Sequence, residues 1–262
     1  MCLGRIPPLG SVRLVPERLT LCVDVGATSI KAVAVQGTGE ALGARARRRT
    51  TYPVSPDALV ATITELADRL EPTGRAAVGF PGMVRRGVVL SAANLARTSG
   101  TGSALDDGLV AAWKDFDLSG ALAVSLGRQV KVANDADVAA LGCSSGRGVE
   151  LTVTLGTGVG TGLVVDGVLA PHLELSEISM LGASTLDDLL GERVRQTLSS
   201  AAWDDRVAAV LHQLDEIIHF DRCYLTGGNA RRLRRDSLGT LLKRVTVVAE
   251  PVGLLGGIRL FD

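Results

Sequence analysis

The stretch that decides the fold is LTVTLGTGVGTGLVVDGVL, residues 151–169. Valine, leucine and threonine favour β-strands, and five glycines interrupt the strand pattern. Glycine allows positive φ in a tight turn and lets a ligand approach the backbone closely. The stretch therefore predicts a β-hairpin, whose glycines either make a tight turn in the core or form a cradle for a negatively charged group.

A similar pattern occurs earlier in the chain, in LCVDVGATSIKAVAVQG, which begins at residue 21. The two segments align without a gap, and identical residues fall at five pairs of positions: Leu21 and Leu151, Val23 and Val153, Gly26 and Gly156, Val35 and Val165, Gly37 and Gly167. Chance explains some of these identities in valine-rich sequence. However, each hairpin opens a long stretch of alternating strands and helices, which favours two related halves.

Helices and strands alternate after each hairpin. Residues 55–70 carry apolar residues at helical spacing behind a Ser-Pro-Asp start, and residues 204–220 place their apolar residues on one helix face. The sequence also predicts strands and turns over 75–95, a helix near 105–127, a strand at 129–134, a strand ending in glycines at 222–228, and a strand followed by a glycine-rich helix over 245–261. The predicted class is α/β.

The composition is that of a globular chain without a membrane span. Apolar residues make up 46% and charged residues 21% of 262 residues, and the formal net charge is +0. A neutral chain argues against nucleic acid as the main partner, so the basic runs at 45–49 and 230–235 are interpreted as solvated surfaces. No apolar run reaches the roughly 18 residues of a membrane helix.

The cysteines and the first residues indicate the compartment. Cys2, Cys22, Cys143 and Cys223 show neither CxxC pairing nor zinc-ligand spacing, so we expect no zinc, no disulfide framework and a cytoplasmic location. Residues 1–18 lack the apolar core of a signal peptide and are expected to form a poorly ordered extension.

The first hairpin carries residue types suited to phosphate. Successive backbone N–H groups at a glycine turn form an anion-binding concavity, which a structural hairpin does not need. A carboxylate at Asp24 can hold a hydrated Mg²⁺ beside phosphates. The candidate phosphate-binding residues of this hairpin are Asp24, Gly26, Ala27, Thr28 and Lys31, with Asp24 also the candidate metal ligand.

A second polar group follows the predicted strand at 129–134. Asn134 and Asp135 lie where a strand ends and a helix begins, which is where α/β proteins bind ligands. Helix N-capping explains them equally well. The functional interpretation is that Asp135 accepts the proton of an attacking hydroxyl while Asn134 holds a neighbouring hydroxyl.

Five motifs together resemble one family. LCVDVGATSIKA, VGFPGMVRRGVVLSAANL, VKVANDADVAALG, LTVTLGTGVGTGLVVDGVLAP and YLTGGNARR occur in the order and approximate spacing of the ROK family of sugar kinases, and look most like its polyphosphate glucokinase branch. The resemblance implies the actin-like ATPase fold of hexokinases, with two α/β domains around a cleft. We expect a smaller domain at 19–117 and a larger one at 118–262.

The resemblance also implies a reaction and a set of site residues. The reaction is Mg²⁺-dependent transfer of a phosphoryl group from ATP or polyphosphate to a hexose hydroxyl, expected to be the 6-hydroxyl, with Asp135 as the base. A homodimer is possible. By analogy, the second phosphate loop is Gly156, Thr157 and Gly158, the nucleotide side is Gly227, Gly228 and Asn229, and the sugar contacts are Gly82, Asn94, Asn134, Asp135, Glu174 and Glu177.

The chain departs from the family pattern near the sugar. Where the family usually has Glu-x-Gly-His, this chain reads Glu174 to Glu177, or in a shifted match has Met180 in place of the histidine. His172 has the wrong spacing and is interpreted as an exposed loop histidine. Asn229 replaces a third glycine. Two alternatives therefore stay open: a binding protein that has lost turnover, and a kinase for an amino or modified sugar whose cationic group Glu177 suits.

The donor is also left open by the sequence. ATP is the general choice of the family, whereas polyphosphate needs a basic track beside the phosphate turns. Arg85, Arg86 and the run at 45–49 are the candidates for such a track. An N-terminal DNA-binding domain, as in the family's repressors, does not fit into eighteen residues, so a regulator is disfavoured.

Overall fold

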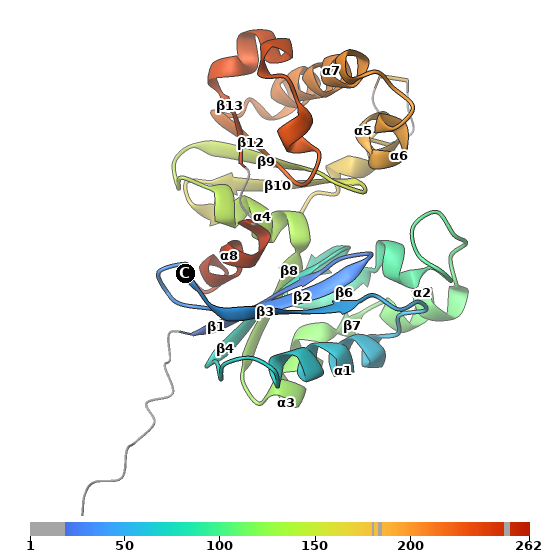
Figure 1. Ribbon diagram of the computed structural model, residues 1–262, viewed down its shortest axis with the longest axis vertical. Coiled ribbons are helices and arrows are strands. Elements are labelled where there is room, and N and C mark those ends of the chain that lie inside the picture. The colour runs from blue at the N-terminus through green and yellow to red at the C-terminus, as the bar shows by residue number, and fades with distance from the viewer. Residues whose placement is uncertain (1–18, 180, 183–184, 249–251) are drawn as a thin grey trace, which may run out of the picture.

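Two five-stranded sheets lie one above the other in the computed structural model, which describes residues 19–179, 181–182, 185–248 and 252–262 (Figure 1). The first sheet has the strand order β3-β2-β1-β4-β8. Its strands are β1 (Thr20–Val25), β2 (Ser29–Val35), β3 (Ala41–Arg49), β4 (Arg75–Phe80) and β8 (Gln129–Asn134). β1 and β2 form the predicted antiparallel hairpin, while β4 and β8 run parallel to β1.

The second sheet repeats this arrangement with the order β11-β10-β9-β12-β13. Its strands are β9 (Val149–Leu155), β10 (Val159–Val165), β11 (Val168–Leu169), β12 (Arg222–Thr226) and β13 (Val245–Val247). β9 and β10 are antiparallel, and β12 and β13 run parallel to β9. The two halves that the aligned hairpins predicted are therefore present, and the predicted α/β class is confirmed.

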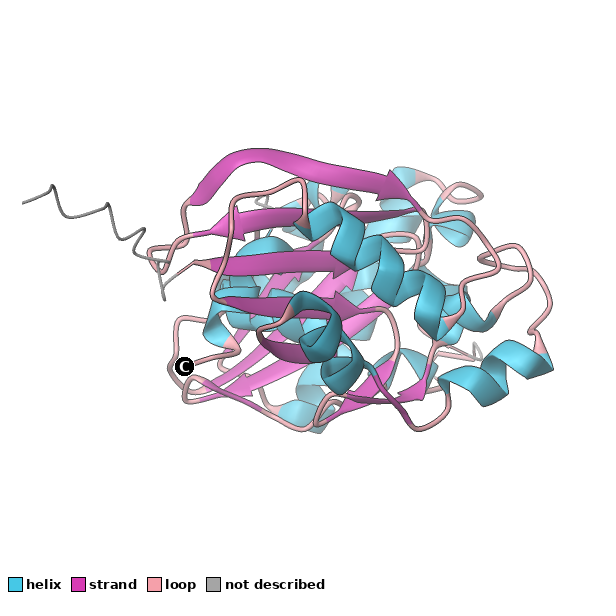
Figure 2. Ribbon diagram, turned by 90° about the horizontal axis from the view of Figure 1, so that it is seen from below, coloured by secondary structure: helices cyan, strands magenta, loops and turns pink. Residues whose placement is uncertain are grey.

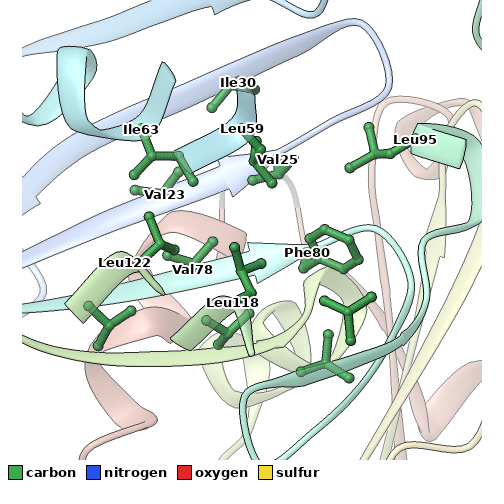
Figure 3. Close-up of a cluster of buried hydrophobic side chains, with 14 of the residues drawn as sticks. Val23, Val25, Ile30, Leu59, Ile63, Val78, Phe80, Leu95, Leu118 and Leu122 are labelled. Carbon is green, nitrogen blue, oxygen red and sulfur yellow. The ribbon is translucent and has the colours of Figure 1, made fainter. Parts of the chain in front are cut away.

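Helices cover the outer face of the first sheet. α1 (Pro56–Ala67) begins at Ser55, whose hydroxyl accepts the N–H of Ala58, and α3 (Leu118–Leu126) packs beside it. Seen from below, both helices lie across the sheet (Figure 2). Figure 3 shows the resulting core, in which side chains of α1 and α3 meet those of β1, β2 and β4; its labelled members include Val23, Ile30, Leu59, Ile63, Val78, Phe80, Leu118 and Leu122.

The second sheet has its own core under α7 (Ser200–Ile218). Trp203, Val207, Leu211 and Leu214 are buried along one face of this helix, as the apolar spacing predicted. Ser199 caps its start. Further short elements complete this half: η2 (Leu175–Glu177), α5 (Asp187–Leu190), α6 (Glu192–Arg195), η3 (Ala230–Arg232) and η4 (Arg235–Lys243).

Two helices lie between the sheets. α4 (Asp135–Cys143) contacts β9 and β10 of the second sheet, while α8 (Val252–Arg259) contacts α4 and also β1 and β4 of the first sheet. The two helices approach so closely that a Cβ on Gly256 would lie 1.8 Å from the carbonyl oxygen of Val138. Glycine is therefore required at this crossing, where the chain returns from the second half to the first.

One expected helix differs from the structure. The single helix expected near 105–127 is α2 (Asp107–Trp113) and α3, separated by β7 (Phe116–Asp117), because Asp115 adopts a positive φ of 59° and Asp117 caps a new helix. The domain boundary expected at residue 118 stays a prediction; α3, which packs beside α1 on the first sheet, follows that residue. β8 pairs with β4, so the first sheet ends at Asn134.

The remaining elements form a small three-stranded sheet. It consists of β5 (Met83–Arg85), β6 (Val88–Ser91) and β7, and the short helix η1 (Ala93–Ala96) follows it. None of the helices in the described ranges is long and apolar enough to span a membrane. The extension expected at 1–18 lies outside the described residues.

Candidate active site

The turn between β1 and β2 is held from behind by the segment that follows β3. The hydroxyl of Thr50 donates to the carbonyl oxygen of Gly26 at 2.7 Å. The hydroxyl of Tyr52 donates to the carbonyl oxygen of Ala27 at 3.0 Å. The N–H of Thr50 donates to the carbonyl of Thr28 at 3.1 Å. Within the described part of the chain, the N–H groups of Ala27 and Thr28 have no acceptor. Two free donors at one turn suit an anion.

The turn between β9 and β10 is built in the same way. The carbonyl oxygens of Leu155 and Gly156 accept from the backbone N–H and the side-chain amide of Asn229, at 3.0 and 3.2 Å. The carbonyl of Thr157 accepts the N–H of Glu192 at 3.2 Å. The N–H groups of Thr157 and Gly158 have no acceptor among the described residues. Both turns therefore offer a pair of free backbone donors.

Asp24 and Lys31 face one another across the first hairpin. Their side chains form an ion pair at 3.1 Å, and both are partly exposed to solvent. Exposed ion pairs contribute only about 0–1 kcal/mol, so this pair opens readily for a ligand. Mg²⁺ usually takes one or two carboxylates together with water and phosphate oxygens. A single carboxylate beside a phosphate turn fits that donor set, and no cluster of three or more metal-ligating side chains occurs among the described residues.

Asn134 caps the helix that carries Asp135. Its side-chain oxygen accepts the N–H groups of Ala136 and Asp137, at 2.8 and 3.4 Å, and its amide donates to the carbonyl of Gly82 at 3.0 Å. The capping interpretation of Asn134 is therefore correct, and the side chain is only 5% exposed. Whether this amide also holds a sugar hydroxyl stays a prediction.

Asp135 has the electrostatics of a general base. Burial raises its pKa to about 7, and the negative charges of Asp24 and Glu174 act in the same direction. The N–H of Ala136, which donates to its carboxylate at 2.8 Å, opposes that shift. A base works best when its pKa lies near the operating pH. Asp24 and Glu174 are thus close enough to Asp135 for their charges to raise its pKa.

Gly82 lies beside the Asn134 cap, and the segment that leads to Asn94 packs against it. A Cβ on Gly82 would come 2.3 Å from the carbonyl oxygen of Ser91 and 3.2 Å from Ala92, so only glycine fits there. The same contact brings the segment leading to Asn94 against Gly82. Asn94 is partly exposed, and no hydrogen bond of its side chain occurs within the described ranges. Its amide is available to a ligand.

His172 is buried, so its interpretation as an exposed loop histidine is wrong. Its ring lies 3.0 Å from a carboxylate oxygen of Asp137 and 3.3 Å from one of Glu174. Burial alone lowers the pKa of His172, but the two carboxylates outweigh burial and raise it to about 9. A protonated His172 therefore ties the loop that carries Glu174 to α4, next to Asp135.

The two glutamates of the altered sugar motif have different surroundings. Glu174 is partly buried, accepts a hydrogen bond from Ser176 and has its pKa lowered chiefly by His172. Glu177 is exposed on η2. Glu174 belongs to the cluster around Asp135, whereas Glu177 does not join it through any described contact. Met180 lies outside the described residues.

The end of β12 approaches the second turn. Gly227 has a φ of +91°, and a Cβ there would lie 2.5 Å from the carbonyl oxygen of Leu155. A Cβ on Gly228 would meet no heavy atom within 4 Å, which leaves open space beside it. Asn229 braces the second turn, and its amide also donates to Glu192 at 2.7 Å. A nucleotide role for these three residues stays a prediction.

The residues that hold the turns were missed by sequence reasoning. Thr50, Tyr52, Glu192 and Asp187 carry no local motif, and Asp187 accepts the N–H of Val159 at 2.6 Å beside Gly158. Each acts on a turn that lies far away in sequence. A motif search finds the glycines of a turn but not the side chains that orient it.

Comparison with known proteins agrees with this arrangement. The model of the ROK family matches residues 20–171. A polyphosphate glucokinase of Mycobacterium tuberculosis is 27% identical over 246 residues, which cover 90% of this chain and 87% of the relative.

Solved structures show the same fold. An inorganic polyphosphate/ATP-glucomannokinase from Arthrobacter sp. strain KM is 26% identical, with a TM-score of 0.75 over 94% of this chain and 100% of the other. A ROK glucokinase from Streptomyces griseus, solved with glucose and AMPPNP, is 19% identical, with a TM-score of 0.70 over 92% of this chain and 98% of the other. The fold is therefore the actin-like ATPase fold of these kinases, and the chain belongs to the ROK family.

Proposed function

We propose that the chain is a Mg²⁺-dependent sugar kinase that transfers a phosphoryl group from ATP or polyphosphate to a hexose, at the 6-hydroxyl. The observation that carries this proposal is Asp135, a carboxylate with a pKa of about 7 at the start of α4. The two turns with free backbone donors supply the complementary feature, a place for phosphate oxygens.

The relatives support the same reaction class and both donors. The Mycobacterium tuberculosis relative is a polyphosphate glucokinase, and the Arthrobacter relative is a polyphosphate/ATP-glucomannokinase. The chain is a phosphotransferase of this kind. We infer glucose or a closely related hexose as the acceptor, because the named acceptors of these relatives include glucose.

The mechanism follows from the chain's own residues. Asp135 accepts the proton of the sugar hydroxyl as that oxygen attacks the terminal phosphorus of the donor. The P–O bond to the rest of the donor breaks, and ADP or a polyphosphate shortened by one phosphate leaves. The N–H groups of Ala27, Thr28, Thr157 and Gly158 donate to the oxygens of the transferring group, where negative charge must be stabilised. Lys31 adds a positive charge once it leaves Asp24. Asp24 would hold Mg²⁺, which would supply charge neutralisation for the donor phosphates.

Glu174 and Asn94 are the proposed sugar contacts best placed for this reaction. Glu174 lies in the cluster around Asp135, fixed by His172 and Ser176. A carboxylate accepts hydrogen bonds from sugar hydroxyls, and an asparagine amide both donates and accepts. Fixing both reactants in line removes much of the entropy cost of the transfer.

A coupled assay tests the proposal. Purified protein with Mg²⁺ is supplied with ATP or polyphosphate and a panel of hexoses and amino sugars. Sugar-dependent transfer is expected, and Asp135→Asn should lower kcat by about 10²–10⁴-fold, because the general base is lost. Asp205→Asn, an exposed position on α7, serves as the matched control.

Two results would lead to other functions. Sugar or nucleotide binding without any turnover supports a binding protein. Transfer only to an amino sugar would keep the mechanism and change the acceptor. The carboxylates near the proposed sugar position would then attract the cationic amino group.

Three other expectations remain part of this proposal. We place the enzyme in the cytoplasm, with a small sugar as its partner and without a nucleic-acid partner. The free cysteines Cys22, Cys143 and Cys223 agree with a reducing compartment. A homodimer is the proposed assembly.

A further inference from the structure

The edge strand β3 carries a row of arginines on one face of the first sheet. In the antiparallel pairing with β2, Arg47 lies opposite Lys31 and Arg49 lies opposite Ser29. Residues that lie directly opposite in a sheet share a face, and alternate residues of a strand do so too. Arg47 and Arg49 therefore lie on the same face as Lys31 and, one strand further, Asp24.

This face is directed toward the second half of the molecule. Cys22 of β1 and Val33 of β2, which alternate with Asp24 and Lys31 on it, pack against Ile258 of α8. The opposite face is the one that α1 covers. Arg48, the residue between the two arginines, is on that covered face and pairs with Glu65 of α1. Neighbouring arginines of one strand thus have different surroundings.

The row begins at the first phosphate turn. Thr50, which follows Arg49 directly, donates to the carbonyls of Gly26 and Thr28, so Arg49 is fixed next to that turn. Arg47 lies two residues further along the strand, about 7 Å away. Arg45 comes next on β3, where the pairing with β2 is irregular, so Arg47 and Arg49 are the arginines whose face the pairing fixes.

The charges of this row are not compensated. Arg45, Arg47 and Arg49 are exposed, and within the described ranges none of them forms an ion pair or a side-chain hydrogen bond. The guanidinium fork suits phosphate oxygens, and repeated cations along a straight edge suit a ligand with repeated anions. A nucleoside triphosphate has charge only near the turn, whereas a linear polyphosphate continues to present charge beyond it.

The other basic candidate lies elsewhere. Arg85 and Arg86 line a groove that also includes Val130 and Lys131 of β8. β8 forms the edge of the first sheet opposite to β3. These arginines are therefore separated from β3 by the width of the sheet, and the row on β3 is the one that adjoins the phosphate turn.

We propose that Arg45, Arg47 and Arg49 bind the distal phosphates of an inorganic polyphosphate whose terminal phosphate lies at the first turn. The inference rests on the proposed kinase function and names the donor for which this surface is built. It predicts a preference for long polyphosphate over short polyphosphate, because only a chain that extends beyond the turn reaches Arg47 and Arg45.

The test is the double variant Arg47→Gln/Arg49→Gln, with Arg48→Gln as a control from the same strand. KM is measured for long polyphosphate, for tripolyphosphate and for ATP, each at low and high salt. The double variant should raise KM for long polyphosphate by about tenfold, with a smaller rise for ATP and a weaker dependence on salt. The chain-length preference of the unaltered protein should disappear, and Arg48→Gln should retain it.

Several outcomes would overturn the inference. One is an equal rise in KM for ATP and for long polyphosphate in the double variant. Another is an unchanged KM for long polyphosphate in that variant, and a third is the same rise in KM in Arg48→Gln. Direct binding of long polyphosphate, measured by calorimetry without sugar, separates this failure from failure of the kinase function. Absence of phosphoryl transfer from every donor defeats the kinase function, whereas binding that does not weaken in the double variant defeats the arginine row. Equally tight binding of a single-stranded oligonucleotide of matched charge would overturn the assignment to polyphosphate.

Discussion

The two glycine turns offer similar backbone donors but differ in length and in their surroundings. Each lies between the first two strands of a sheet of the same order, and each has carbonyls held from behind and two free N–H groups. The first turn has the ion pair of Lys31 and Asp24 and, beyond it, the unpaired arginines of β3. The second has the carboxylates of Asp187 and Glu192 beside it, and Arg195 pairs with Glu192. The backbone cradle is thus repeated, while its charge is not.

This difference gives the turns different tasks. A polyanion is attracted to the first turn by nearby positive charge. At the second turn, the carboxylate of Asp187 accepts the N–H of Val159 beside Gly158, and in its ionised form it repels a bare phosphate. A phosphate whose charge is compensated by a cation is accepted more easily. We therefore propose that the first turn captures the donor and that the second contacts it once its charge is neutralised.

Among substitutions at the two turns, the largest effect is expected from loosening the second turn. Asn229→Ala removes the side-chain donor to Gly156 and to Glu192, leaving a carbonyl and a carboxylate without this partner. We expect kcat/KM to fall by about 10–100-fold, because an unsatisfied group of this kind costs about 1–3 kcal/mol. Steady-state kinetics with both donors measures the loss.

The counterpart at the first turn should be milder. Tyr52→Phe removes only the donor to Ala27, and Thr50 still holds Gly26 and Thr28. We expect kcat/KM to fall by about threefold to fivefold. If Tyr52→Phe proves more damaging than Asn229→Ala, the two turns are not held in the way described.

Charge changes at the two turns should act in opposite directions. Lys31→Met removes a cation from the first turn and should raise the donor KM by about fivefold to tenfold. Asp187→Asn keeps an oxygen that accepts the N–H of Val159 but removes a negative charge from the second turn. It should lower the donor KM by a few-fold and reduce the Mg²⁺ concentration required. Measuring the rate as a function of Mg²⁺ concentration distinguishes the two variants. A change of the donor KM in the same direction in both variants contradicts the comparison.

The smallest effect on turnover is expected at His172, which supports the site without touching a turn. Its pKa in the folded protein is about 9, above the ordinary value of 6.5. The stability that it contributes is thus complete below about pH 6.5 and is lost as the pH rises through about 9. His172→Gln should lower the free energy of unfolding by about 1–3 kcal/mol at pH 6 and by much less at pH 10. Urea unfolding at the two pH values measures this, and a pH-independent loss argues against a charged His172.

Local patterns were sufficient for the strands, the hairpins and the position of Asp135. Valine and glycine spacing predicts a hairpin from neighbours in sequence, and a strand followed by Asn134 and Asp135 predicts a helix start. The bracing of the turns was not predictable in this way. Thr50 lies two dozen residues from the turn it holds, and Asn229 more than seventy from Gly156.

The same reason explains the errors. His172 looked exposed because its partner Asp137 lies on α4, far away in sequence. The pairing of β8 with β4 is likewise not visible in either strand alone. The contact of α8 with β1 was also not predictable, because α8 must first cross α4 closely at Gly256.

The most direct test of the account is the pH dependence of kcat/KM for the sugar. Burial, together with Asp24 and Glu174, raises the pKa of Asp135 to about 7, and the base acts only when it is ionised. The rate should therefore rise as the pH increases through about 7, and Asp135→Asn should lose both the rate and this limb of the profile. A rate that stays constant over this range, or an Asp135→Asn variant with near-normal kcat, would contradict the assignment of Asp135 as the base.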